Sequence, residues 1–425
     1  MLSRHGVHAE VWAMERRSQH LADRTGMRAA VAAADYRVAV DYYYRGRSIG
    51  GRTFQGWLPA RKQRFLTDFG VRDAVRDWQL LHTLEIPEPA ERARRLFVGG
   101  HSLGGPLANF YCQWDFADGP GYQEIAGVLG VDGPITVDPL EIARLRPVSA
   151  AAGAAHRALT AATRTGALPA SSNWGPLRLG DLAVLTGIAA IAARFEPDSE
   201  TDILQHVPRG MLLDGLFLLL YPRGGPRRWR LTNAALFGTL FGRVAQATTL
   251  ANDMGTYAGA VRHKRALLTD LPRIPLAGEL LGAVLTQRPL LMPADPHGTL
   301  TGWRTSSDAI SSFDDTVFAW GNGEFSYLNT YESRRLPVEM VLALIGARTG
   351  ALRGLQHRDW TDHRPHLTIA GDVFAPIRTR RGPRPNEIDA PGYSHQDMLS
   401  ATQPDVVVES IAAFLTANAA IARTA

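Results

Sequence analysis

The feature that most constrains this chain is the position of its uninterrupted apolar runs. Arg95–Gly99 (RLFVG) and Ile125–Val131 (IAGVLGV) lie in the first third, and His366–Ala370 (HLTIA) lies near the end. A strand with one face in solvent alternates polar and apolar residues, and none of these runs does so. The segments between the runs have the periodicity of amphipathic helices. This alternation favours the α/β class, with a mainly parallel sheet covered by helices on both faces.

Weaker signals extend the pattern towards both ends of the chain. Val71–Leu84 places its apolar residues on one helical face, and Pro106–Trp114 is a helix with proline in its first turn. We expect a short strand at Glu387–Ala390, a final amphipathic helix at Val406–Ala417, and a strand at His8–Met14.

Between about Ile135 and Arg335 the strand signals disappear and the sequence becomes rich in alanine and leucine. This composition predicts helices separated by proline and glycine. We therefore expect residues 1–135 and 336–425 to form two parts of one α/β core, and residues 136–335 to form a helical cap inserted between them.

Charge and apolar content exclude several classes of protein. The 46 basic residues face 41 acidic ones for a net charge of +5, and the arginines are scattered, so we expect no nucleic-acid binding. Neither Gly180–Ala193 nor Gly210–Tyr221 reaches the roughly 20 residues of a membrane span. No signal peptide is visible, which predicts a cytoplasmic protein and leaves an upstream export signal open. The single cysteine, Cys112, forms no internal disulfide and is expected in the core.

One motif indicates chemistry. Gly100-His101-Ser102-Leu103-Gly104 fits the pattern G-x-S-x-G and lies between a predicted strand and a predicted helix. A serine on such a sharp turn is exposed at a helix N-terminus, where backbone dipoles favour developing negative charge. A second match around Ser48 is followed by helix-breaking Gly56 and Pro59, so we expect no role for Ser48 in catalysis.

The motif and its setting resemble the α/β-hydrolase fold superfamily, in particular its serine esterase and lipase branch. The resemblance implies a nucleophilic Ser102 and an oxyanion donor in the N–H of Leu103. It also implies that the helical cap covers the active site as a lid.

Nucleophilic serine requires a histidine base and an acid that orients it. The family places the histidine after the last strand, where this chain has His395. Asp372 follows HLTIA, the usual acid position, and is the preferred acid; Asp132, after IAGVLGV, is the alternative because some members place the acid one strand earlier. Asp397 is expected to cap the last helix or to orient the histidine loop.

The chain departs from the family at its start. The loop that supplies a second oxyanion donor follows an apolar strand, and no such segment precedes Gly100. Loss of one donor alone lowers the rate by about a hundred- to a thousandfold. We expect a start site assigned too late; a true truncation would favour a catalytically impaired binding protein.

The resulting hypothesis is a serine hydrolase that cleaves small-molecule or lipid-like carboxylic esters without a cofactor or a metal. Lipase, amidase and acyltransferase chemistry remain alternatives because they share the triad. The cluster of His357, Asp359, Asp362, His363 and His366 fits no standard zinc spacing, so we interpret it as a solvated loop, with metal binding as the alternative. Gly210–Tyr221 with the arginines after it favours a buried cap helix, and contact with a membrane surface is the alternative. The oligomeric state stays open.

Seven aromatic residues in the second half of the cap are interpreted as core, with an acyl pocket as the alternative. They are Trp303, Phe313, Phe318, Trp320, Phe325, Tyr327 and Tyr331.

Overall fold

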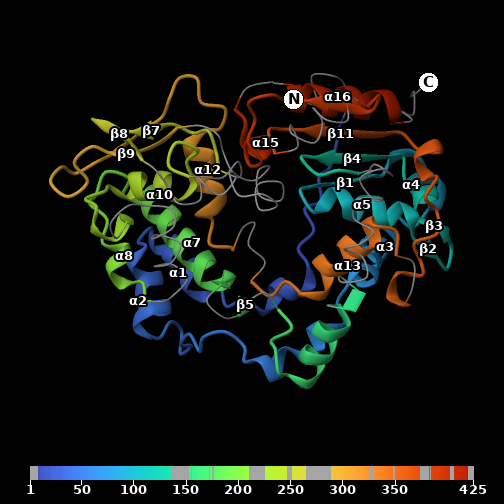
Figure 1. Cartoon of the computed structure of the whole chain (residues 1–425), viewed down its shortest axis with the longest axis horizontal. Helices are drawn as coiled ribbons and strands as arrows, with labels where there is room; N and C mark the ends of the chain where they lie inside the picture. The colour runs from blue at the N-terminus through green and yellow to red at the C-terminus, as the bar shows by residue number, and fades with distance from the viewer. Residues whose placement is uncertain are drawn as a thin grey trace.

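The computed structural model forms two lobes, one built around a sheet and one mostly helical (Figure 1). The described residues are 8–135, 153–154, 156–171, 173–174, 177–209, 225–246, 251–264, 289–325, 330–347, 350–373, 382, 384–402 and 406–419.

The sheet has four parallel strands in the order β1-β4-β11-β12. Their bounds are β1 Phe97–His101, β4 Gly127–Val131, β11 His366–Ala370 and β12 Glu387–Asp389. The register pairs His101 with Val131 and Val131 with Ile369, so the carboxyl ends of these strands meet at one edge. The structure thereby confirms a mixed α/β protein with a parallel sheet.

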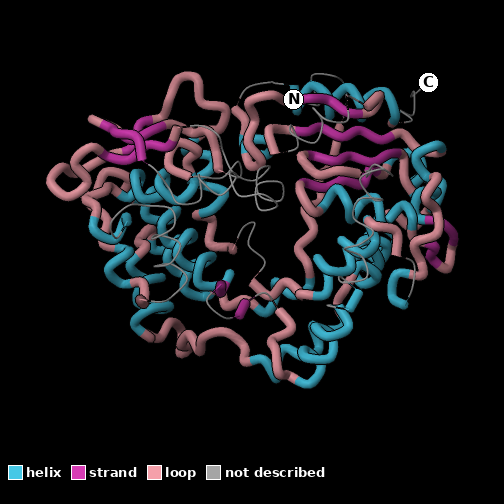
Figure 2. Tube along the Cα trace, viewed as in Figure 1, coloured by secondary structure: helices cyan, strands magenta, loops and turns pink. Residues whose placement is uncertain are grey.

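Helices cover both faces of this sheet (Figures 1 and 2). One face packs against α3 and α5 in a core that includes Val98 and Val128. The other face packs against α16, whose Val407 joins Leu367 and Ile369. The helices of this lobe are α3 Val71–Glu85, α4 Pro89–Arg95, α5 Gly104–Gln113, α13 Arg335–Leu344, α15 Asp397–Ser400 and α16 Val406–Asn418.

The second lobe is organised around one apolar helix, α7 (Leu179–Phe195). Its residues from Ala183 to Ala193 are buried, so α7 is a central core helix. Around it lie α1 Thr25–Ala33, α2 Arg37–Arg45, α8 Ile203–His206, α10 Asn233–Phe241 and α12 Phe313–Trp320. Helices α1 and α2 pack in this core, although the sequence assigned residues 1–135 to the sheet-bearing core.

Four short pairs of antiparallel strands also form, and the sequence did not predict them. The pairs are β2 Asp115–Phe116 with β3 Gly119–Pro120, β5 Asn173–Trp174 with β6 Leu177–Arg178, β7 Thr256–Tyr257 with β10 Trp303–Arg304, and β8 Val261–Lys264 with β9 Leu290–Pro293. The 3₁₀ turns are η2 Arg17–Leu21, η3 Ala60–Asp68, η4 Gly121–Glu124, η5 Gly225–Arg228, η7 Gly350–Leu352 and η8 Trp360–Asp362.

The strand expected at His8–Met14 is wrong. These residues form an irregular segment with Val11 84% exposed. The chain just after it is held by the helical lobe, where Arg16 pairs with Glu332 and the Gln19 amide donates to the Phe325 carbonyl. Among the described residues, β1 therefore pairs only with β4, and its outer edge has no partner strand.

None of the described helices combines the length and the apolarity that a bilayer span requires. Gly180–Ala193 lies within the buried α7. Gly210–Tyr221 lies outside the described residues.

Candidate active site

Ser102 occupies the turn between β1 and α5. Its backbone has φ +56°, the left-handed region that residues with a side chain rarely adopt, and its N–H donates to the Val131 carbonyl over 3.1 Å. A Cβ on Gly100 would lie 2.4 Å from the Gly104 Cα. The turn therefore requires glycine at position 100 and stores strain at the serine.

The second close backbone approach involves Gly105 and not Gly104. A Cβ on Gly104 would meet nothing within 4 Å, whereas one on Gly105 would lie 2.4 Å from the Gly133 carbonyl oxygen. A Cβ on Gly133 would lie 2.1 Å from the Ser102 carbonyl oxygen. These glycines allow the start of α5 to lie directly against the loop after β4.

Ser48 has none of this geometry. It is exposed in the turn that follows α2, beside the bridge between Ile49 and Arg52. No strand precedes it and no helix follows directly, as the sequence indicated.

His395 lies in the loop between β12 and α15 and pairs with Asp132. The distance between its Nδ1 and the Asp132 Oδ2 is 2.6 Å. The Asp132 carboxylate is fully buried, and its Oδ1 also accepts the Gly371 N–H over 2.8 Å. The alternative acid is thus the one that orients the imidazole, because Asp132 follows β4 directly beside the serine turn.

The sequence favoured Asp372 as the acid, and the pairing of His395 with Asp132 corrects this prediction. The Asp372 Oδ2 accepts from Arg243 over 2.7 Å, and its Oδ1 accepts the Gly392 N–H over 2.9 Å. Arg243 is buried and follows α10 of the helical lobe. The Asp372 carboxylate is therefore engaged in an ion pair between the lobes and makes no hydrogen bond or ion pair with His395.

Ser102 and His395 both follow strands of the parallel sheet at its carboxyl edge, and His101, the residue before Ser102, contacts His395. The His101 ring lies 4.1 Å from the His395 ring, and its Nε2 lies 2.8 Å from the His395 carbonyl oxygen. Within the described residues, the Ser102 hydroxyl makes no hydrogen bond.

Leu103 directly follows Ser102 and is the N-cap residue of α5. Its backbone N–H donates to no acceptor in the part of the chain that the structure describes. It belongs to the first turn of α5, where unpaired N–H groups carry partial positive charge. This N–H is thus available to an acceptor outside the described chain.

A buried network that sequence reasoning identified only in part holds the His395 loop. Asp397 accepts the Ser394 N–H over 3.0 Å, so it orients the loop. Its other oxygen accepts the Asp253 N–H over 2.8 Å and the Ser311 hydroxyl, both from the helical lobe. These partners lie 144 and 86 residues away, and no local pattern marks them.

His101 and His82 are neutral at pH 7 in the fold. Burial, with the charge of His395, lowers the pKa of His101 to about 4, and burial, with the charge of Arg92, lowers that of His82 to about 4. The Nε2 of a neutral His101 then carries a proton when it donates to the His395 carbonyl, which fixes the tautomer.

These two imidazoles predict a loss of stability in mild acid. Unfolded histidine takes up a proton near pH 6.5, whereas His82 and His101 resist protonation down to about pH 4. Stability therefore falls as the pH drops from 6.5 to 4, by on the order of 3 kcal/mol for each histidine. Urea unfolding at pH 7.5 and 4.0 measures this change.

His82→Gln is expected to reduce the loss of stability, and replacement of the half-exposed His363 by glutamine serves as the control. An equal loss in wild type and His82→Gln would contradict the prediction.

The histidines that cluster in the sequence between residues 357 and 366 make separate contacts in the structure. Among the described residues no three potential ligands gather, and His363 stacks on the Tyr122 ring. Two of the described arginines that follow Gly210–Tyr221 are engaged within the protein: Arg227 donates to the Val207 carbonyl, and Arg230 pairs with Glu200. The interpretation of Gly210–Tyr221 as a buried cap helix or a membrane contact lies outside the described residues.

Most of the described cap aromatics contribute to the core. Phe313 and Trp320 pack with Phe237, while Phe325 and Tyr331 are buried elsewhere. Trp303 is partly buried and Phe318 is 57% exposed, and Tyr327 lies outside the described residues.

Comparisons with known proteins identify no relative. No protein-family model, no curated protein and no solved structure matches the chain.

Proposed function

We propose that this protein is a serine hydrolase that cleaves carboxylic esters. The proposal rests on one observation above the others: the fully buried Asp132 fixes the ring of His395, and this ring lies 4.1 Å from the ring of His101, which directly precedes a serine held at φ +56°. A strained backbone persists only where surrounding structure enforces it, and it concentrates at functional sites.

Each residue has a distinct step in the reaction. Ser102 Oγ attacks the ester carbonyl while His395 Nε2 accepts its proton, and Asp132 stabilises the resulting imidazolium. The negative oxygen of the tetrahedral intermediate accepts the Leu103 N–H. His395 then protonates the leaving alcohol, and water, deprotonated by the same ring, releases the acid from the acyl-enzyme.

The arrangement also supports membership of the α/β-hydrolase superfamily. The elbow strand, the acid-bearing strand and the strand before the histidine loop are β1, β4 and β12, in the parallel order β1-β4-β11-β12. An acid after β4 is the less common of the two positions expected. The helical lobe contacts the His395 loop through Asp253 and Ser311, as a cap over the site would.

The second candidate is a catalytically impaired binding protein of the same fold. The unpartnered outer edge of β1 in the described residues favours it, because the second oxyanion donor of the family lies in that region. A protein that only binds would leave Ser102 unreactive.

Labelling with a fluorophosphonate separates the two candidates. The hydrolase is expected to gain one adduct, located on Ser102 by peptide mass mapping, and to hydrolyse p-nitrophenyl acetate or butyrate. Ser48→Ala should be labelled as fully as wild type. A folded wild-type protein that gains no adduct and hydrolyses neither ester would support the binding protein and exclude the hydrolase.

A further inference from the structure

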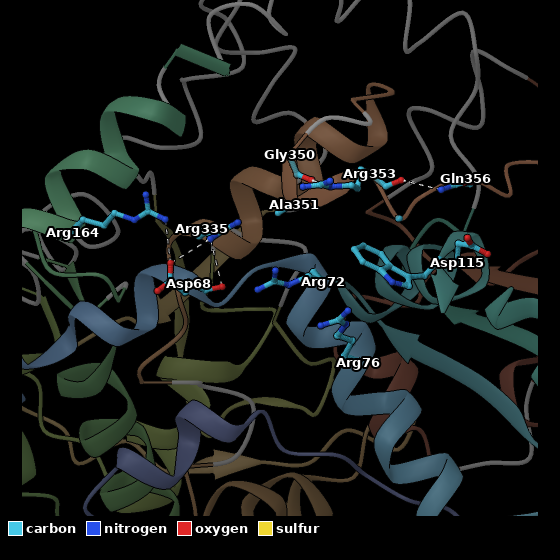
Figure 3. A pocket seen from close by; sticks show the side chains of 12 residues that line it. Asp68, Arg72, Arg76, Asp115, Arg164, Arg335, Gly350, Ala351, Arg353 and Gln356 are labelled. Atoms are coloured by element: carbon cyan, nitrogen blue, oxygen red, sulfur yellow. Dashed lines mark hydrogen bonds and ion pairs between the residues drawn. The ribbon is translucent and has the colours of Figure 1, made fainter. Parts of the chain in front are cut away.

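A cavity of about 730 Å³ is lined by α3, by the start of α13 and by the residues that directly follow α5 (Figure 3). Its volume is within the range of small-molecule sites. Trp114, which follows the last residue of α5, lines it, while Ser102 precedes the first residue of that helix. A helix of ten residues separates its ends by about 15 Å, so this cavity is distinct from the serine site.

The cavity is dominated by guanidinium groups that come from four separate segments. Its five arginines are Arg72, Arg76, Arg164, Arg335 and Arg353. The carboxylates that line it are Asp68 and Asp115.

Existing ion pairs neutralise one side of the cavity. Arg164 lies 3.3 Å and Arg335 lies 3.8 Å from the Asp68 carboxylate, and Arg335 also pairs with the buried Glu339. On the other side, Asp115 is engaged by His357 over 3.2 Å. The acidic groups of the cavity are therefore already engaged.

Three arginines retain positive charge for an external partner. Arg76 and Arg353 have no carboxylate partner in the described chain; Arg353 donates through Nε to the Gly350 carbonyl. Arg72 contacts only its sequence neighbour Asp73, over 3.3 Å, and its Nε is buried without an acceptor. Figure 3 shows Arg72 and Arg76 projecting from α3 towards the same space.

This arrangement is unfavourable without an anion. Arg72 and Arg76 are one helical turn apart, where like charges repel, and a buried N–H without an acceptor lowers stability further. A bound anion would remove both penalties. The planar guanidinium matches phosphate oxygens in a bidentate manner, which makes clustered arginines phosphate sites.

We propose that this cavity binds a small molecule that carries a diphosphate group. Two to three unneutralised guanidiniums match the charge of one diphosphate better than that of a single phosphate. The diphosphate could belong to inorganic pyrophosphate or to a nucleotide; the shared chemistry defines the site. The proposal does not depend on catalysis at Ser102.

Calorimetric titration of the full chain at low salt with inorganic pyrophosphate, ADP and inorganic phosphate tests the site. Pyrophosphate, ADP or both should bind at one site per chain, and at least tenfold more tightly than phosphate. If only pyrophosphate binds, the free ion is the ligand; if ADP binds at least as tightly, the ligand is a nucleotide. Binding of neither, or equal affinity for phosphate, would overturn the proposal.

The variants Arg76→Gln and Arg353→Gln locate the site, since both side chains are exposed and neither replacement disturbs a packed core. Each is expected to weaken binding by about tenfold, and the double variant by about a hundredfold. Arg94→Gln, an exposed arginine on α4 outside the cavity, is the matched control. An equal loss in Arg94→Gln would show diffuse charge attraction and overturn the site. Ester hydrolysis should be unchanged in all three.

Discussion

Asp132→Asn is expected to lower kcat/KM for a p-nitrophenyl ester by about a thousand- to ten-thousandfold. The asparagine has the shape of the aspartate, and its oxygen retains the acceptor role towards the Gly371 N–H. The amide cannot stabilise an imidazolium, and it favours the wrong tautomer of His395. The fold should therefore survive while the base fails, which steady-state kinetics and a melting curve measure together.

Asp372→Asn is the matched control and should give the opposite pattern. It leaves Arg243 buried, with the Asp253 carboxylate 3.8 Å away as its remaining acidic neighbour. Breaking a buried pair by removing one partner destabilises a protein by about 3–5 kcal/mol, and surviving contacts reduce this value. We expect a lower melting temperature with kcat within about tenfold of wild type. A larger kinetic loss in Asp372→Asn than in Asp132→Asn would contradict the assignment.

The elements that sequence predicted well are those with local signals. HLTIA forms β11 with the expected bounds, and GHSLGG lies between a strand and a helix. A short, uninterrupted apolar run flanked by turn residues favours a buried strand. The turn at Gly100 leaves no room for a Cβ, so only glycine fits there. The sequence also indicated His395 as the candidate histidine, because it comes after the last predicted strand.

The choice of acid depended on a residue from the other lobe. Asp132 and Asp372 both follow parallel strands, so their carboxylates reach the same edge of the sheet. Arg243, 129 residues before Asp372, engages one carboxylate and leaves the other to His395. No periodicity reveals such a pairing, because it depends on how the two lobes pack.

The same limit explains the errors at the start of the chain. Residues 8–14 have the short apolar run of a strand, but a strand also needs a neighbour for its backbone groups. Directly after this segment, Arg16 pairs with Glu332 and Gln19 donates to the Phe325 carbonyl, so the chain packs against the helical lobe. Helices α1 and α2 follow, and their apolar faces fit α7.

Ser102→Ala is expected to lower kcat by roughly a millionfold, to the background that the remaining groups sustain, because no other side chain can form the acyl-enzyme. Ser48→Ala should retain full activity, since Ser48 is an exposed turn residue. Loss of turnover on Ser48→Ala with retention on Ser102→Ala would reverse the assignment of the nucleophile.

The backbone of Ser102 adds a test that does not depend on turnover. Alanine at φ +56° keeps the strain of the turn, whereas glycine adopts this conformation without a steric penalty. Ser102→Gly should therefore be inactive like Ser102→Ala but more stable than it by about 1 kcal/mol in urea unfolding. Equal stability of the two variants would show that the turn is not strained, and the argument from strain to catalysis would then fail.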